Sequence, residues 1–119
     1  MEKITKFEDL EIWKNGMRLT VKIYELMRNC KDFAFKDQIQ RAAVSIPSNI
    51  SEGFERQTNK EFVQFLYIAK GSCGELRTQL YLAKELGYIE KCDFDILLDN
   101  AKHLSAMIFN LIQTRKTNF

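Results

Sequence analysis

Residues that interrupt helices are scarce in this chain, which has one proline and five glycines among 119 residues. Because glycine and proline are the strongest local breaks in regular structure, their scarcity predicts a few long elements. Apolar residues recur with the period of a helix buried on one side, and no segment has the two-residue period of a strand. The sequence therefore predicts an all-α fold.

Four helices are expected in one domain that spans residues 1–119. Their predicted ranges are 8–30, 36–55, 58–86 and 91–114. Long amphipathic helices with short connections favour an antiparallel up-down four-helix bundle.

Local signals mark several of the helix ends. Thr5 with Glu8, and Thr58 with Glu61, have the spacing of a capping box at a helix start. Gly87 is placed to cap the third helix at its C-terminus. Residues 115–119 are expected to be a frayed tail.

Two of the helices have more apolar surface than one chain can cover. The first helix carries one stripe of Leu10, Trp13, Met17, Val21 and Tyr24, and beside it a second stripe of Ile12, Leu19, Ile23, Leu26 and Cys30. In the third helix, Gly71 and Gly74 lie away from the core stripe, where each costs about 0.5–1 kcal/mol against alanine. Both features favour burial of the second side against another copy of the chain.

The segment 41–53, RAAVSIPSNISEG, contains the only proline, Pro47. A proline inside a helix removes one backbone hydrogen bond and costs about 3 kcal/mol. Either the helix kinks at Pro47, or one helix ends near Val44 and another begins with Ser45 as its cap. The apolar stripe keeps its phase through Pro47, which favours the kinked continuous helix.

The polar residues of this segment are interpreted as structural. Helical geometry places Arg41, Ser45, Ser48 and Glu52 in one polar stripe, puts Asn49 at its border, and leaves Gly53 beside the core stripe. Asn49 and Glu52 are expected to bond backbone or neighbouring side chains at a helix–helix or subunit contact. Glu52 and Glu75 are candidates to meet across the bundle, in a hydrogen-bonding role rather than in acid–base catalysis.

Little in the sequence indicates catalysis. His103 is the only histidine, and no paired metal-binding motif, phosphate loop or cofactor signature is present. The cysteines Cys30, Cys73 and Cys92 have no metal-binding spacing and are interpreted as reduced thiols of a cytoplasmic protein. No segment has the length of a signal peptide or membrane span. We expect no enzyme, metal, cofactor or membrane.

Nucleic acid is the stronger candidate partner, although the net charge is only +2. Basic residues form one row of Lys14, Arg18 and Lys22, and another of Lys70, Arg77 and Lys84. Such rows can follow the phosphates of RNA or DNA without reading bases. The alternative is that both rows are solvated faces of the bundle.

Several segments resemble a known family. They are Phe7-Glu-Asp-Leu10 with Trp13, the run Gln38-Ile-Gln-Arg41 to Gly53, Phe65-Leu-Tyr-Ile-Ala-Lys-Gly-Ser72 with Glu75, and Leu86-Gly-Tyr88. Together they resemble the four-helix bundle proteins encoded in intervening sequences of 23S ribosomal RNA genes. The resemblance implies a bacterial homopentamer with a nucleic-acid-associated role and no known enzymatic activity. The chain is also similar to the accessory protein of diversity-generating retroelements, which implies a reverse transcriptase as a candidate partner.

Two hypotheses follow. The first is a non-enzymatic homo-oligomer that binds RNA through Lys14, Arg18, Lys22 and neighbouring basic residues. The alternative is a scaffold or adaptor for another protein, without direct nucleic-acid binding, which the near-neutral charge favours.

Overall fold

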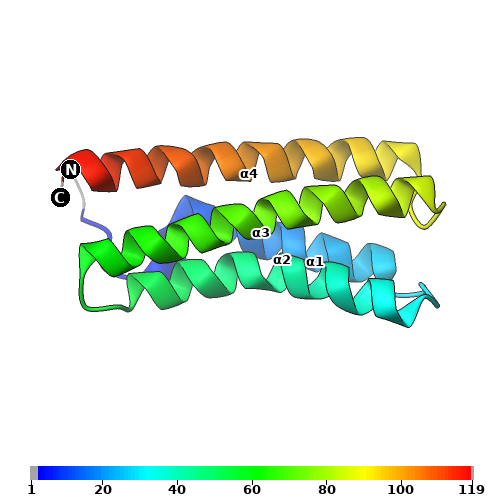
Figure 1. Ribbon diagram of the computed structural model, residues 1–119, viewed down its shortest axis with the longest axis horizontal. Helices are drawn as coiled ribbons and strands as arrows, with labels where there is room; N and C mark the ends of the chain where they lie inside the picture. Colours follow the sequence, from blue (N-terminus) through cyan, green and yellow to red (C-terminus); the bar gives the residue numbers. More distant parts are fainter. Residues whose placement is uncertain (1–2, 119) are drawn as a thin grey trace.

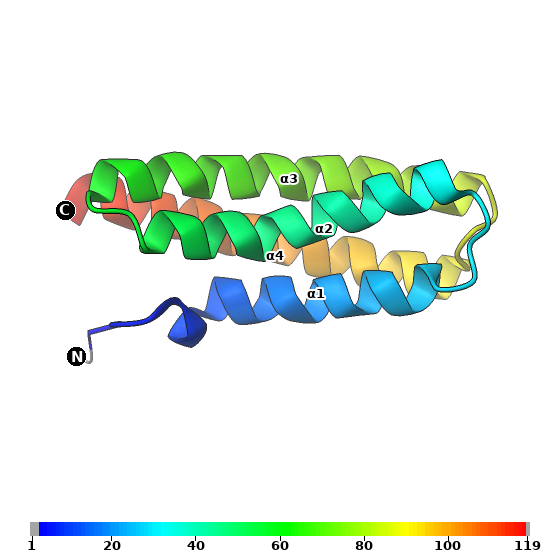
Figure 2. The ribbon, with the colours of Figure 1, turned by 90° about the horizontal axis from the view of Figure 1, so that it is seen from below.

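The structure, a computed structural model, describes residues 3–118 and has four α-helices and no strand within that range. The helices are α1 (Glu11–Met27), α2 (Phe33–Phe54), α3 (Asn59–Glu85) and α4 (Lys91–Asn118), preceded by a short 3-10 helix, η1 (Phe7–Asp9). They lie side by side in a rod of 45 × 22 × 20 Å, and the connections alternate between its two ends (Figures 1 and 2). The predicted all-α fold of four helices is confirmed. Over residues 3–118, no helix is long and apolar enough to span a membrane.

The start of α1 differs from the prediction of a helix from residue 8. Residues Phe7–Asp9 form η1, and Leu10 is extended with φ −73° and ψ 127°, so α1 begins at Glu11 and ends at Met27. Neither η1 nor α1 has a side-chain cap. The capping box predicted from Thr5 was therefore wrong.

The start of α2 lies three residues before the predicted position. The Asp32 carboxylate accepts a hydrogen bond from the backbone N–H of Phe35 at 3.2 Å and caps the helix. Because Asp32 satisfies an otherwise unpaired N–H of the first turn, residues predicted as loop become helical.

Both ends of α3 have the predicted caps. The Thr58 hydroxyl oxygen accepts a hydrogen bond from the N–H of Glu61 at 3.2 Å. At the other end, Gly87 has φ +77° and the N–H of Tyr88 donates to the carbonyl of Ala83 at 2.8 Å. This is a Schellman motif, in which glycine takes the left-handed position without steric cost.

The end of α4 is helical where a frayed tail was predicted. The helix continues to Asn118, and Phe119 lies outside the described residues. Arg115 donates to the Asn59 side chain at 3.3 Å, and Asn59 donates to the Arg115 carbonyl at 3.1 Å. These bonds tie the last turns of α4 to the start of α3.

Helix α2 runs unbroken through Pro47, which confirms the continuous helix and excludes the two-helix alternative. In Figure 2 the cyan first half of α2 is inclined to its green second half. Pro47 has no N–H for the carbonyl of Ala43, and the hydroxyl of Thr20 on α1 donates to that carbonyl instead, at 3.0 Å. The two helices pack closely here, and a Cβ on Gly16 would just reach van der Waals contact with the proline ring, at 3.4 Å.

Other polar side chains of the segment bond to α2 or to the residues just after it. Ser45 donates to the carbonyl of Ala42 at 2.8 Å, and Asn49 donates to the carbonyl of Ser45 at 2.7 Å. Glu52 accepts from Arg56 at 3.4 Å. Asn49 and Glu52 thus have bonded partners, Asn49 on its own helix and Glu52 just beyond the end of α2; their predicted place at a helix–helix or subunit contact stays a prediction.

Arg41 and Glu75, which were also interpreted as structural, have partners nearby in the sequence. Arg41 forms an ion pair with Asp37 at 2.8 Å, and Glu75 accepts a hydrogen bond from Gln79 at 3.5 Å. Glu75 is thus bonded within α3 and Glu52 to a residue just after α2, and no hydrogen bond joins the two among residues 3–118. Ser48 is exposed, whereas Gly53 is buried against Phe65 of α3.

Candidate nucleic-acid interface

The basic row on α1 is accompanied by acidic residues. Lys14 forms an ion pair with Glu11 at 3.6 Å, and Lys22 with Glu25 at 3.9 Å. Exposed pairs of this kind add little stability, but each carboxylate lowers the positive potential beside its lysine. Arg18 is held by a hydrogen bond from its Nη2 to the Asn15 side chain at 2.8 Å.

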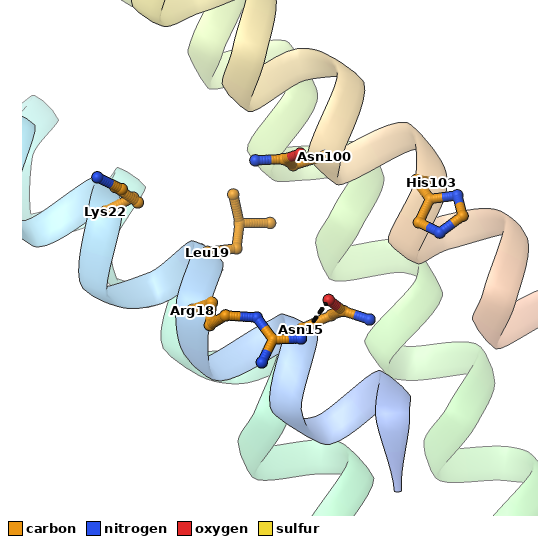
Figure 3. Close-up of a pocket in the computed structure, with 6 residues that line it drawn as sticks. All are labelled: Asn15, Arg18, Leu19, Lys22, Asn100 and His103. Carbon is orange, nitrogen blue, oxygen red and sulfur yellow. Dashed lines mark hydrogen bonds between the residues drawn. The ribbon is translucent and has the colours of Figure 1, made fainter.

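A groove separates this row from α4, where the bundle is least tightly closed. It encloses about 230 Å³ and is lined by Asn15, Arg18, Leu19, Lys22, Asn100 and His103. Figure 3 shows Leu19 and Asn15 of α1 on the side of Asn100 and His103, whereas the Lys22 side chain points away from Asn100. The groove offers several hydrogen-bond donors and has room for one small anionic group.

The basic row on α3 is not neutralised. Within residues 3–118 no ion pair forms at Lys70, Arg77 or Lys84. Instead, the Lys84 ammonium lies 4.4 Å from the centre of the Phe94 ring of α4, and that of Lys70 lies 5.9 Å from the Phe109 ring. Two of the cations thus lie over aromatic rings, and neither forms an ion pair with a carboxylate.

Two cavities lie along the same side of α3. One, of about 260 Å³, is lined by Gly74, Arg77, Thr78, Tyr81, Leu98 and Lys102. The other, of about 430 Å³, lies near the start of α3 and is lined by Asn59, Lys60, Val63, Gln64, Tyr67, Arg115 and Lys116. We call the surface that joins them the α3–α4 seam, and its named members are Lys70, Arg77, Lys84, Lys102, Lys116, Tyr67, Tyr81 and Phe109.

Sequence reasoning missed the contribution of α4 to this surface. Lys102, Phe109 and Lys116 are spaced by seven residues, so they lie on one face of α4. The spacing shows in the sequence that these residues share a helix face, but which face of α4 turns toward α3 depends on packing. The seam therefore unites one predicted row with two lysines that had not been considered.

Other reactive groups are not arranged for chemistry. Burial raises the pKa of the Cys73 thiol to about 11, so it is a protonated core residue at neutral pH. Burial also lowers the pKa of Arg115, whose guanidinium lies 4.9 Å from the centre of the Phe62 ring. In the part of the chain that the structure describes, no three His, Cys, Asp or Glu side chains form a metal-binding group.

Comparison with known proteins agrees with the resemblance seen in the residues. The family model described as "23S rRNA-intervening sequence protein" matches residues 8–110. A solved structure of a protein of unknown function from the S23 ribosomal protein family of Bacteroides thetaiotaomicron VPI-5482 superimposes with a TM-score of 0.81. It is 23% identical, and the match covers 87% of this chain and 99% of that one, so it supports the fold. No similar protein was found among curated proteins. On the family match, the chain belongs to the 23S rRNA-intervening sequence protein family.

Proposed function

We propose that this chain is a non-enzymatic, antiparallel up-down bundle of the bacterial cytoplasm that binds nucleic acid through the α3–α4 seam. The observation that carries the proposal is the uncompensated charge there: Lys70, Arg77 and Lys102 have no acidic partner within residues 3–118, whereas Lys14 and Lys22 do. Phosphate binding releases counterions and needs cations that are not already neutralised. This favours the seam over the α1 row as the phosphate-binding face.

Two variants of equal charge test the proposal. The seam variant carries Lys70→Gln, Arg77→Gln and Lys102→Gln; the control carries Lys14→Gln, Arg18→Gln and Lys22→Gln. Binding of a labelled RNA is followed by fluorescence anisotropy from about 50 mM salt upward, because phosphate contacts are strongest at low salt. The seam variant should lose affinity and lower the salt slope by about two to three, at about 0.7–0.9 for each of the three phosphate contacts.

The control variant should bind close to the wild type. Equal losses of RNA affinity in the two variants would show that binding follows the overall charge rather than the seam. Absence of binding by the wild type at about 50 mM salt would refute a nucleic-acid role altogether.

Self-association is the second part of the proposal. Met17, Val21 and Tyr24 follow one another along α1 and are 40%, 51% and 44% exposed, so this part of the stripe that begins at Leu10 is left uncovered by the chain's own helices. An uncovered apolar stripe of this kind is typical of a contact surface, and the resemblance implies a homopentamer. Light scattering tests this, and a stable 14.0 kDa monomer would contradict it.

A protein scaffold is the alternative function. The exposed stripe on α1 and the paired charges beside it favour an apolar protein partner there over nucleic acid. Capture from a nuclease-treated lysate separates the two, since partners held only through nucleic acid are lost. A partner protein that survives nuclease treatment and is lost in a Val21→Glu variant would favour the scaffold.

A further inference from the structure

Three exposed aromatic rings lie among the cations of the α3–α4 seam. Tyr67, Tyr81 and Phe109 are 44%, 47% and 43% exposed. The Lys116 ammonium lies 5.8 Å from the centre of the Tyr67 ring and donates to its hydroxyl at 3.4 Å. Each ring therefore keeps nearly half of its surface uncovered and lies beside basic side chains.

The Tyr81 ring is held in place by packing. The Tyr81 ring makes an edge contact with Phe94, with ring centres 5.1 Å apart and planes at 63°. Phe94 is only 4% exposed, so the contact anchors Tyr81 to the core. A ring fixed in this way loses little freedom when another flat group stacks on it.

The space between the two tyrosines is open. About 21 Å of helix separates Tyr67 from Tyr81, at 1.5 Å per residue. Gly71 and Gly74 lie between them, and a methyl group on either would meet no atom within 4 Å. Their conformation is helical, so neither glycine is needed for the backbone, and no contact inside the chain requires its small size.

Exposed aromatic rings beside a row of cations are typical of surfaces that bind single-stranded nucleic acid. Unpaired bases stack on aromatic rings, while a row of cations follows the phosphates. In a duplex the base faces are covered by their neighbours, so exposed rings add nothing to duplex binding. Aromatic rings and cations on one seam thus favour single strands over duplexes.

We propose that the α3–α4 seam binds a single-stranded polynucleotide, with bases stacked on Tyr67 and Tyr81 and the strand passing over Gly71 and Gly74. The inference rests on the proposed function and specifies its ligand. RNA and DNA single strands share the chemistry that the seam recognises, so both are tested.

The experiment compares oligonucleotides of about 12 residues, within the range that such surfaces occupy, as single-stranded RNA, single-stranded DNA and duplex. The proteins are the wild type, Tyr67→Leu/Tyr81→Leu and Tyr67→Phe/Tyr81→Phe. Leucine keeps apolar bulk without a π-face, and phenylalanine keeps the ring. Tyr24→Leu on α1 is the matched control, since Tyr24 is 44% exposed, as Tyr67 is.

The wild type should bind single strands more tightly than duplex. The leucine pair should lose about fivefold in single-strand affinity per tyrosine, the equivalent of about 1 kcal/mol each and the low end of measured stacking effects. The phenylalanine pair and Tyr24→Leu should bind as the wild type does. Tighter binding of RNA than of DNA would indicate additional contacts to the 2′-hydroxyl. Equal binding would indicate that base stacking and phosphate contacts account for the affinity. Both results support the proposal.

A second variant separates binding from folding. Gly74→Leu places a side chain on the floor between the tyrosines and raises helix propensity. We expect it to weaken single-strand binding while the midpoint of unfolding stays the same or rises. Binding at wild-type strength in Gly74→Leu would contradict the path over the glycines.

Failure of this inference differs from failure of the proposed function. If the wild type binds duplex and single strands alike, and the leucine pair binds as the wild type does, the stacking inference is overturned while the charged seam stands. If nothing binds, both fail. A change of oligomer mass in the leucine pair would show that the seam is a subunit contact and would also overturn the inference.

Discussion

The hydroxyl of Thr20 compensates α2 for the missing N–H of Pro47, and Thr20→Val removes that hydroxyl while keeping the side chain's shape. The Oγ1 atom lies 3.0 Å from the carbonyl oxygen of Ala43 and 2.7 Å from that of Gly16. The Gly16 carbonyl keeps its helical donor, whereas the Ala43 carbonyl loses its protein donor in the variant. Burying an unsatisfied polar group costs about 1–3 kcal/mol. Thr20 is half-buried, so we expect a loss of about 1–2 kcal/mol in the free energy of unfolding.

A double-mutant cycle with Pro47→Ala isolates this contact. Alanine at position 47 restores an N–H, and the Ala43 carbonyl then regains a donor from its own helix. Thr20→Val should therefore cost less in the Pro47→Ala background, by about 1 kcal/mol. The effect of Pro47→Ala by itself cancels in the cycle.

Chemical denaturation followed by circular dichroism gives the four free energies. Protein concentration is held constant, because self-association would add to the apparent stability. Thr20→Ser is the control, since it keeps the donor and loses only a methyl group. Equal costs of Thr20→Val in both backgrounds, within about 0.5 kcal/mol, would refute the reasoning.

Two further predictions concern the glycines and the loops. Gly74→Ala should raise the free energy of unfolding by about 0.5–1 kcal/mol, because the methyl group meets nothing and the helix gains propensity; Gly53→Ala should lower it, because its Cβ would lie 2.5 Å from the Cβ of Phe65. The pKa of Asp32 is lowered from 3.8, first by the hydrogen bond that Tyr88 donates to its carboxylate at 2.6 Å. The ionised carboxylate therefore stabilises the folded chain above pH 3.8, and this stabilisation is lost as the pH falls through the folded pKa. The difference in unfolding free energy between wild type and Tyr88→Phe should narrow in acid, and an undiminished difference at low pH would show that the carboxylate is not involved.

The local part of the fold could be predicted from the sequence. The caps at Thr58 and Gly87 and the continuation of α2 through Pro47 follow from spacing and helical phase, which involve neighbours along the chain. The length of α4 could not be predicted in this way. Its last turns depend on the bonds between Arg115 and Asn59, and 56 positions separate these residues in the sequence.

The candidate site could also be predicted only in its local part. The two basic rows were visible as helical spacing, and the ion pairs of Lys14 and Lys22 were readable as acidic residues three positions away. The place of Lys102 beside Arg77 was not readable, since it depends on how α4 is rotated against α3. Helical period says which residues share a face, and packing decides which faces meet.

The meeting of Gly16 with Pro47 also sets the alignment of α1 and α2 along their axes. Apolar stripes alone would allow α1 to slip by one turn, about 5.4 Å, because similar side chains recur at that interval. After such a slip Ile12 or Thr20 would face the proline, where a single Cβ would already be in contact at 3.4 Å, and the Ala43 carbonyl would lose its donor. The contact with the proline thus makes one axial alignment of α1 and α2 more stable than the alignments one turn away. A residue unfavourable to its own helix therefore favours one alignment of that helix against its neighbour.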